Sequence, residues 1–326
     1  MQQTILSDSA RPSAEAQAAE TRRIRAARQK AILCVLGAAA TFALAAAAVK
    51  ALRGEVPVMQ VILFRNLLAI PVLLALAVLA ARKAGRNASL AALLTTRQPF
   101  AHAQRVLWGL LGMFGSFYGY VHLPLATVTA LSFTMPFFLA GLSVLMLGET
   151  LQRGRMLAML AGFGGVLVML RPWEGLEQTG LPLVPVLVVL AGALGWALAM
   201  ITIRRMGENG ESGATIVLWF ALGGTVVGAV AALPGWAWPD GRQWALLVAV
   251  GVISAFAQLL MTAAYRSGDT TLIAPFEYSG ILWTTALGAL VWEEWPDAWS
   301  VAGIAILVTG GLAMWWSNTR GNARGG

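Results

Sequence analysis

The sequence predicts an all-α membrane protein with ten transmembrane helices, arranged as two inverted repeats of five helices each. Three observations predict this fold. First, 58% of the 326 residues are hydrophobic and only 12% are charged, about half the charged share of an average soluble domain. Second, the apolar residues form stretches of roughly 18–23 residues, each long enough to cross a ~30 Å hydrocarbon core as a helix. Third, the second half of the chain repeats features of the first.

Hydropathy places the spans in chain order. We expect them at 31–50, 58–80, 104–122, 125–147, 153–170, 182–203, 213–232, 244–264, 271–292 and 298–316. Each span must be a helix, because lipid offers no partner for free backbone N–H and C=O groups. Pro124 separates the third span from the fourth, since proline cannot continue a helix without loss of a hydrogen bond. Pro275 lies within the ninth span, where a broken or kinked helix is expected.

Both ends of the chain are polar. Residues 1–30, rich in Ala, Gln and Arg, are expected to form a disordered cytoplasmic leader, and residues 317–326 a cytoplasmic tail. The basic flank before the first apolar run also fits a cleaved signal peptide. That run is about 20 residues long, which exceeds a typical signal core, so we expect it to remain as the first span.

A shift of 145 residues aligns Tyr120–Met169 with Tyr265–Met314 without a gap, and a shift of 154 residues matches the first span to the sixth. The 145-residue shift places Glu149 on Glu294, and each of these acidic residues follows an apolar span. The predicted repeats cover 31–170 and 182–316. Because five is odd, the second repeat enters the membrane from the opposite side, as in many secondary transporters. The alternative is a duplicated membrane protein without a transport role.

Topology, rather than nucleic-acid binding, accounts for the net charge of +8. With the N-terminus inside, 18 of the 23 Lys and Arg residues fall on the inner side and 4 on the outer side, while Arg65 lies within a span. Arg105, at the start of the third span, counts among the inner residues. The positive-inside rule then places both termini in the cytoplasm, and it makes anionic lipid headgroups the partner of the basic residues.

Glu277 is the most informative charged residue. It lies about seven residues into the ninth span, roughly 10 Å deep at 1.5 Å per residue. A carboxylate at that depth costs about 2.5–3.5 kcal/mol, which makes it a candidate functional residue. In the functional interpretation, Glu277 binds a cationic group of the substrate or takes up a proton. In the structural interpretation, it pairs with Arg65 or a backbone group and only fixes packing.

Two basic residues near the outer side need separate interpretations. Arg65 lies about seven residues into the second span. It either contacts an anionic part of the substrate, since arginine binds carboxylate and phosphate in a two-pronged way, or it extends to the headgroups or anchors a helix contact. Lys50, at the outer end of the first span, is interpreted as an interface anchor.

Further candidate residues are expected to line the same central space. The 145-residue shift makes Ser132 the counterpart of Glu277 and Phe133 the counterpart of Tyr278, so a two-fold axis would bring these pairs together. Aromatic rings of other spans could stack on a flat ring or a cation. The other candidates are Phe42, Tyr118, Trp196, Gln258, Tyr265 and Trp283. For each of them, packing or lipid contact is the alternative.

Two glycine motifs allow helices to approach closely. They are Gly115-x-x-x-Gly119 and Gly224-x-x-x-Gly228. Such a motif serves packing either within a bundle or across a homodimer. The sequence leaves both uses open.

The layout and several motifs resemble the drug/metabolite transporter superfamily, in its ten-helix form with two EamA-type domains. In the first half the resemblance rests on Phe64-Arg65, Pro136, Leu147-Gly148-Glu149, Gly162, Gly164 and Gly165. In the second half it rests on Ala274-Pro275-Phe276-Glu277-Tyr278, Trp283 and Glu293-Glu294-Trp295-Pro296. The second half departs from the pattern, because Glu293 stands where the first half has Gly148. The resemblance covers about 31–316 and implies a secondary transporter of the bacterial inner membrane.

The expected function is alternating-access transport of a small polar or amphipathic metabolite. The Ala-Pro-Phe-x-Tyr stretch is similar to a bacterial subgroup with vitamin and S-adenosylmethionine carriers. Riboflavin, S-adenosylmethionine, an amino-acid derivative or a metallophore would each suit one acid, one arginine and many aromatic rings. Proton coupling, exchange against a counter-substrate and simple facilitation remain open.

Two alternative classes are weaker. They are a membrane scaffold or receptor and an integral membrane enzyme. An enzyme would need an acid, base or metal cluster, which the two intramembrane charges do not form. The chain has no Walker loop, no HExxH motif and no convincing nucleophile motif. One cysteine and two histidines exclude a disulfide framework and the usual His-rich metal sites, so the sequence predicts no metal and no cofactor.

Overall fold

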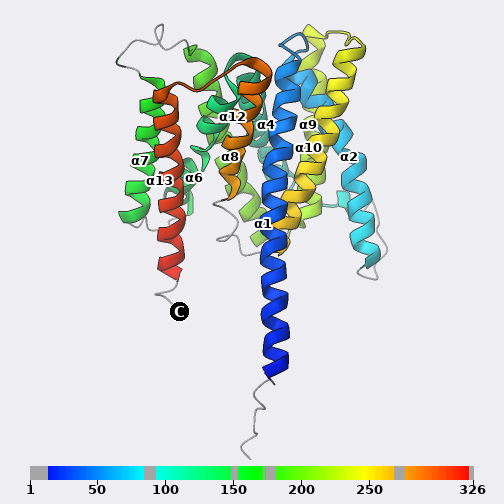
Figure 1. Cartoon of the computed structure of the whole chain (residues 1–326). Helices are drawn as coiled ribbons and strands as arrows, with labels where there is room; N and C mark the ends of the chain where they lie inside the picture. The colour runs from blue at the N-terminus through cyan, green and yellow to red at the C-terminus, as the bar shows by residue number, and fades with distance from the viewer. Residues whose placement is uncertain are drawn as a thin grey trace, which may run out of the picture.

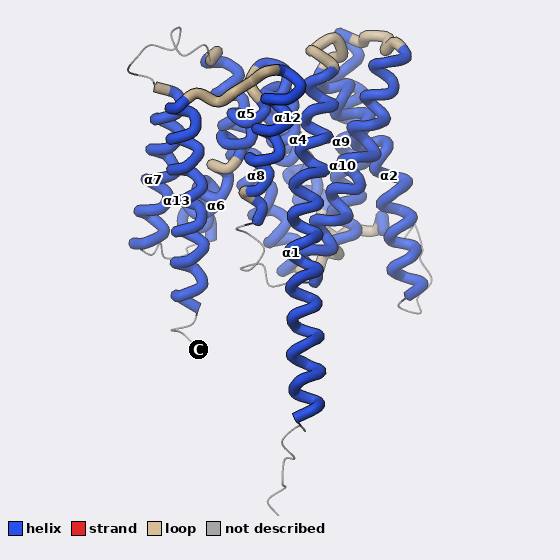
Figure 2. The backbone as a smooth tube through the Cα atoms, in the orientation of Figure 1, coloured by secondary structure: helices blue, strands red, loops and turns tan. Residues whose placement is uncertain are grey.

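The computed structural model is helical, and it describes residues 14–83, 93–147, 153–171, 173, 181–267 and 276–322. Figure 2 shows that helices and loops make up this part of the chain, with no strand in it. The helices are α1 (Ala14–Ala51), α2 (Val58–Lys83), α4 (Pro99–His122), α5 (Leu125–Ser132), α6 (Met135–Leu147), α7 (Arg153–Leu170), α8 (Leu183–Glu208), α9 (Gly213–Ala232), η1 (Leu233–Gly235), α10 (Gly241–Ser267), α12 (Ser279–Trp292) and α13 (Ala298–Asn322).

The apolar helices confirm a membrane protein that crosses the bilayer several times. Within the described residues, six helices are long and apolar enough to span a membrane. They are Arg25–Ala51, Val58–Leu76, Leu125–Met146, Leu183–Glu208, Gly213–Gly235 and Gly241–Met261. Shorter apolar helices cover Leu160–Leu170, Ser279–Trp292 and Ala298–Gly310. The all-α fold class predicted from composition is confirmed.

The fourth predicted span is two helices rather than one. The chain leaves the α-helical pattern between α5 and α6, where the Thr134 N–H bonds to the Leu131 carbonyl at 3.1 Å. The Thr134 hydroxyl donates to the same carbonyl at 2.6 Å. Pro136 has no N–H to give to the Ser132 carbonyl, and its ring clashes with a continuous helix. This proline therefore separates α5 from α6.

The two chain ends also differ from the prediction. Helix α1 begins at Ala14, so residues 14–30 are helical rather than disordered, and α13 continues to Asn322. Ala, Glu, Gln and Arg favour the helix. Extending an existing helix also avoids the cost of nucleating a new one. Figure 1 shows these extensions of α1 and α13 pointing toward the same end of the bundle.

Polar contacts define the two ends of the bundle. At the first, Lys50 in the last turn of α1 forms an ion pair with Glu294, with Nζ and Oε1 2.6 Å apart. At the second, the Thr96 hydroxyl donates to Glu211 at 2.6 Å, and Arg205 in the last turn of α8 donates to the Met146 carbonyl at 2.7 Å. We call these the Glu294 end and the Glu211 end.

Helices that correspond in the two repeats run in opposite directions. Helix α1 ends at the Glu294 end, whereas its counterpart α8 ends at the Glu211 end (Figure 1). Likewise α6 ends near Arg205, whereas its counterpart α12 ends near Glu294. Glu149 lies outside the described residues.

The helix pairing has the symmetry of an inverted repeat. Helix α1 packs against α10, and the corresponding pair, α8 and α4, packs in the same way. Two further strong pairs, α2 with α9 and α7 with α13, each join a helix to its own counterpart. The contact of α1 with α12 likewise corresponds to that of α8 with α6. Exchanging the two halves therefore reproduces the contact pattern, which confirms the two-repeat architecture.

The glycine motifs are used inside the chain. A Cβ on Gly115 would lie 2.7 Å from the Gly192 Cα and 2.7 Å from the Val188 carbonyl oxygen, so α4 and α8 touch backbone to backbone there. A Cβ on Gly228 would lie 3.0 Å from the Leu63 Cα of α2. Both motifs therefore serve packing within the bundle.

The Gly115→Ala variant is expected to be clearly less stable. The added methyl must push α4 and α8 apart, and such overpacking costs about 1–3 kcal/mol, which lowers the melting temperature by a few degrees or more in a chain of this size. Thermal unfolding in detergent measures this. The control is Gly164→Ala on α7, where a Cβ would meet no atom within 4 Å. Equal melting temperatures for the two variants would contradict the close α4–α8 approach.

Candidate functional site

Two arginines lie inside the bundle on neighbouring helices. Arg65 of α2 directs Nη1 to the Met113 sulfur of α4, 3.7 Å away. Arg105 of α4 is 7% exposed. Its guanidinium carbon lies 4.0 Å from the ring centre of Phe220 on α9 and 5.9 Å from that of Trp196 on α8. The two arginines therefore belong to one region between α2, α4, α8 and α9.

The absence of a side chain at Gly109 gives Arg105 its room. A Cβ at this glycine would collide with Nη1 of Arg105, because residues four apart lie on the same helix face. The Arg105 side chain therefore extends along α4 away from the Glu211 end. Its Nε and Nη1 atoms are buried and make no hydrogen bond to the residues that the structure describes.

The contacts of Arg105 with aromatic rings do not by themselves offset the free-energy cost of burying its charge. A cation–π contact contributes about 2 kcal/mol when desolvated, whereas burial of an uncompensated charge costs several kcal/mol. Arg105 was expected on the inner surface, and this prediction is wrong. Helix α4 begins at Pro99, five residues before the predicted span, so the residue lies within the bundle. The sequence feature that could have indicated the buried position of Arg105 is Gly109, four residues later on the same helix face.

The breaks in the fourth and ninth spans meet, as the repeat predicted. The Phe133 ring, between α5 and α6, lies 4.6 Å from the Tyr278 ring, just before α12. Ser132 ends α5 and donates to the Val128 carbonyl at 2.8 Å. Glu277 directly precedes Tyr278 and is half-buried. These four residues, two from each repeat, form what we call the repeat junction.

Arg65 and Glu277 do not form an ion pair, and Arg65 was one of the two partners that the structural interpretation offered for Glu277. Among the described residues, the ion pairs include none between these two side chains. Arg65 belongs to the arginine region, and Glu277 to the repeat junction. The two intramembrane charges therefore have different surroundings.

Lys50 is buried in a polar network rather than anchored at the membrane surface. Besides its ion pair with Glu294, its Nζ donates to the Leu123 carbonyl at 2.8 Å and lies 5.7 Å from the Trp292 ring centre. The second Glu294 oxygen accepts the Leu125 N–H at 3.3 Å. These five residues, which we call the Glu294 network, join the ends of α1, α4 and α12. The interpretation of Lys50 as an interface anchor is therefore wrong.

A second ion pair joins the repeats at the same end. Arg171, after α7, pairs with Asp297, before α13, at 2.7 Å. Partial burial acts to raise the pKa of Asp297, but hydrogen bonds from Ser300 and the Arg171 charge outweigh it and hold this pKa below its ordinary value. Unlike the Glu294 network, this pair is peripheral, with the Asp297 side chain 45% exposed.

The other predicted lining residues have varied positions. Trp196 belongs to the arginine region, whereas Tyr118 stacks on His122 with ring centres 4.1 Å apart. Trp283 is 46% exposed on α12. Phe42 and Gln258 are half-buried on α1 and α10. The Tyr265 side chain lies outside the described residues.

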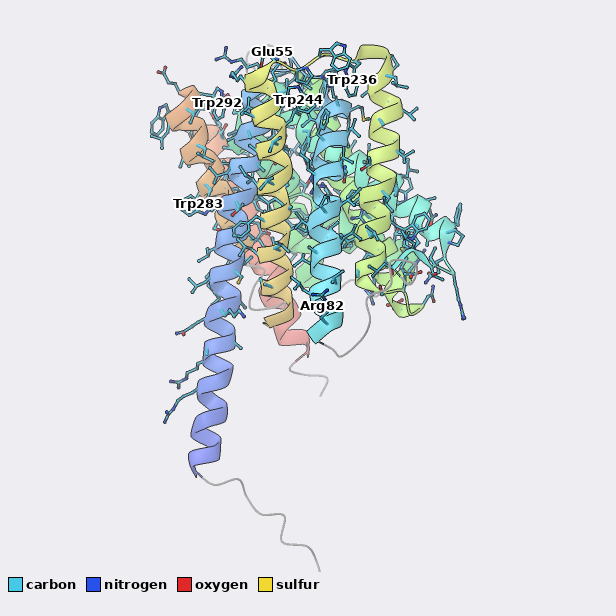
Figure 3. All side chains as sticks on the ribbon, turned by 90° about the vertical axis from the view of Figure 1, so that its right-hand side faces the viewer. Glu55, Arg82, Trp236, Trp244, Trp283 and Trp292 are labelled. Carbon is cyan, nitrogen blue, oxygen red and sulfur yellow. The ribbon has the colours of Figure 1, made fainter. Side chains whose placement is uncertain are left out.

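Tryptophans gather at the Glu294 end. Figure 3 shows Trp236, Trp244 and Trp292 near Glu55 at this end, and Arg82 at the opposite end. Trp238 and Trp295, also at helix ends, are 85% and 75% exposed. Exposed tryptophans at one level of a bundle are typical of the membrane–water interface.

A buried polar pair close to the Glu211 end was not predicted. His102 of α4 is 2% exposed, and its Nε2 lies 3.5 Å from Glu211, before α9. Its ring lies against that of Trp219, with centres 5.3 Å apart. The sequence separates His102 from Glu211 by more than a hundred residues, so no local pattern could show the pair.

An inverted-repeat helical bundle with charged side chains inside it and broken helices at the repeat interface is the architecture of a secondary transporter. The chain belongs to the EamA-like transporter family, whose model matches residues 29–171 and 183–316. The resemblance to drug/metabolite transporters is thus confirmed. The chain is a transporter of small metabolites rather than an enzyme.

Named relatives carry different cargoes. The pseudopaline exporter of Pseudomonas aeruginosa is 30% identical over 87% of this chain and 95% of its own length. The riboflavin transporter of Rhizobium johnstonii is 30% identical over 68% of this chain and 72% of its own. The S-adenosylmethionine uptake transporter of Rickettsia prowazekii is 27% identical over 72% and 76%. A crystal structure at 20% identity shares the fold, with a TM-score of 0.60 over 89% of this chain and 97% of that one.

Proposed function

We propose that the chain moves a small amphipathic metabolite by alternating access, with substrate contacts at the repeat junction. One observation carries this proposal: the helix breaks of the two repeats meet at Phe133 and Tyr278. In inverted-repeat transporters, substrates bind near the midplane where discontinuous helices of the two halves face each other. The aromatic rings offer stacking surfaces, and Glu277 and Ser132 beside them offer polar groups.

Glu277 gives the repeat junction a side that can hold a positive charge. We assign it either a cationic group of the substrate or a transported proton. Relatives named for S-adenosylmethionine, riboflavin and pseudopaline support a substrate with a ring or with mixed charge. The transport assay measures the direction of metabolite transport and its coupling to a proton or a counter-substrate.

We place the Glu211 end in the cytoplasm of a bacterial inner membrane. Basic residues of the described chain support this orientation, because the positive-inside rule counts Lys and Arg. The Glu211 end carries Arg22, Arg25, Lys30, Arg82, Arg97, Arg204 and Arg205. The Glu294 end carries Lys50, Arg53, Arg171 and Arg242. Both termini are then cytoplasmic. A homodimer remains a prediction, although the glycine motifs are already used inside the chain.

Metabolite profiling tests the proposed function. A strain lacking the gene is complemented with the wild type or with an empty vector, and cells and medium are profiled separately. We expect at least one small metabolite to redistribute between cells and medium only with the wild type, and the sense of the change gives the direction. Purified protein in liposomes must then move that compound. Identical profiles in both strains would contradict the proposal.

A further inference from the structure

We infer that Arg65 and Arg105 form an anion-binding site, and that the transported metabolite carries a carboxylate that this site holds. This inference rests on the proposed transport function and names one chemical group of the substrate. Arginine is suited to this role, because its planar guanidinium binds a carboxylate through two parallel hydrogen bonds.

The two arginines reach the same interior region from opposite ends of the bundle. Arg65 lies seven residues after Val58 at the start of α2, about 10 Å from the Glu294 end along the helix. Arg105 lies six residues after Pro99 at the start of α4, about 9 Å from the Glu211 end. The Arg105 side chain then continues over Gly109 toward the middle. Both charges are thus held below the headgroup level of either surface.

The described residues provide no acidic partner for this pair of cations. Neither arginine takes part in an ion pair there. Glu211 accepts from Thr96 and lies against His102, and it forms no ion pair with Arg105. Two neighbouring positive charges repel each other in a medium of low dielectric constant, so both are stabilised when an anion lies between them.

The residues around Arg105 leave hydrogen-bond donors of its guanidinium free to bind a ligand. Phe220 and Trp196 contact the guanidinium through their rings and cannot accept its N–H groups as a carboxylate would. Nε and Nη1 consequently remain without a protein acceptor in the described part of the chain. Because buried polar groups are almost always hydrogen-bonded, we assign the acceptor of these two N–H groups to a ligand. An organic carboxylate with an apolar body fits both the donors and the rings.

Anion binding is tested on the full-length protein in a neutral detergent. Sodium succinate is the carboxylate probe and inorganic phosphate the second oxyanion, with choline chloride at equal ionic strength as the salt control. We expect succinate to raise the melting temperature saturably, and R65Q and R105Q each to weaken its apparent affinity by roughly tenfold or more. R82Q and R97Q, at the Glu211 end, are the controls and should bind succinate like the wild type.

Two further variants separate loss of binding from loss of folding. R105K keeps the charge but loses the two-pronged geometry, and G109A keeps both arginines but removes the room for the Arg105 guanidinium. Both should weaken succinate binding. Unchanged binding in R105Q, or no succinate effect on the wild type, overturns the inference, and a phosphate-only effect overturns the choice of carboxylate. If the wild type transports no metabolite at all, the proposed function fails independently of anion binding.

Discussion

Replacing Glu294 by glutamine is expected to open the Glu294 end and slow transport by about tenfold. Removing one member of a buried ion pair typically costs about 3–5 kcal/mol, and the 22% exposure of the Glu294 side chain reduces the loss to roughly 1–3 kcal/mol. The pair joins α1 of one repeat to the α12–α13 segment of the other, so this free energy favours the closed end. Its loss shifts the equilibrium by about 5- to 150-fold toward the open state.

Thiol accessibility measures that shift. With Cys34 replaced by serine, a cysteine at Leu123, which is 1% exposed, reports opening through its labelling rate with a membrane-impermeant reagent. We expect faster labelling in Glu294→Gln and Lys50→Met, and a double variant that adds little to either. Asp297→Asn breaks the more exposed Arg171 pair at the same end and should change labelling little. Equal labelling in all variants would show that the Glu294 network does not hold this end closed.

Replacing Glu277 by glutamine is the second change with a large expected effect. The substitution keeps the shape of the side chain at the repeat junction and removes its charge, so folding is retained while transport falls by tenfold or more. If Glu277 binds a cationic group, KM rises. If it carries a proton, the rate loses its dependence on a pH gradient. Initial-rate kinetics in liposomes at several pH gradients distinguish the two roles.

Glu208→Gln is the matched control for Glu277, because Glu208 is exposed at the end of α8 and pairs with Arg204 on the surface. It should transport like the wild type. Wild-type kinetics and an unchanged pH dependence in Glu277→Gln would remove this carboxylate from the mechanism. Loss of expression in Glu277→Gln, together with normal transport in Glu277→Asp, would instead assign it a structural role.

The fold could be predicted largely from the sequence, because a bilayer demands long apolar helices and hydropathy locates them. The repeat shift also placed Phe133 on Tyr278, and these rings do touch. The break between α5 and α6 could not be predicted from the sequence alone, because Pro136 does not show whether a helix bends or ends there. Likewise, the position of Glu277 within a span was readable, but its distance from Arg65 depends on how the helices pack.

The misassigned residues were charged ones near span ends. Lys50 and Arg105 both sit where hydropathy changes, and a long basic side chain there can extend outward or inward. Arg105 turns inward because Gly109 leaves space and two aromatic rings receive it. Lys50 turns inward because Glu294 lies opposite, from a segment more than two hundred residues away. Long-range contacts of this kind leave no local pattern.

Alternating access requires the Glu294 end to open during each transport cycle, and cross-linking tests this most directly. Cysteines replace Lys50 and Glu294 in a chain without Cys34, and a cleavable bifunctional thiol reagent joins them in liposomes loaded with the metabolite found by profiling. We expect cross-linking to stop the transport that the double-cysteine variant retains and reduction to restore it, while each single-cysteine variant transports at the same rate before and after the same treatment. Undiminished transport by the fully cross-linked protein would contradict this requirement.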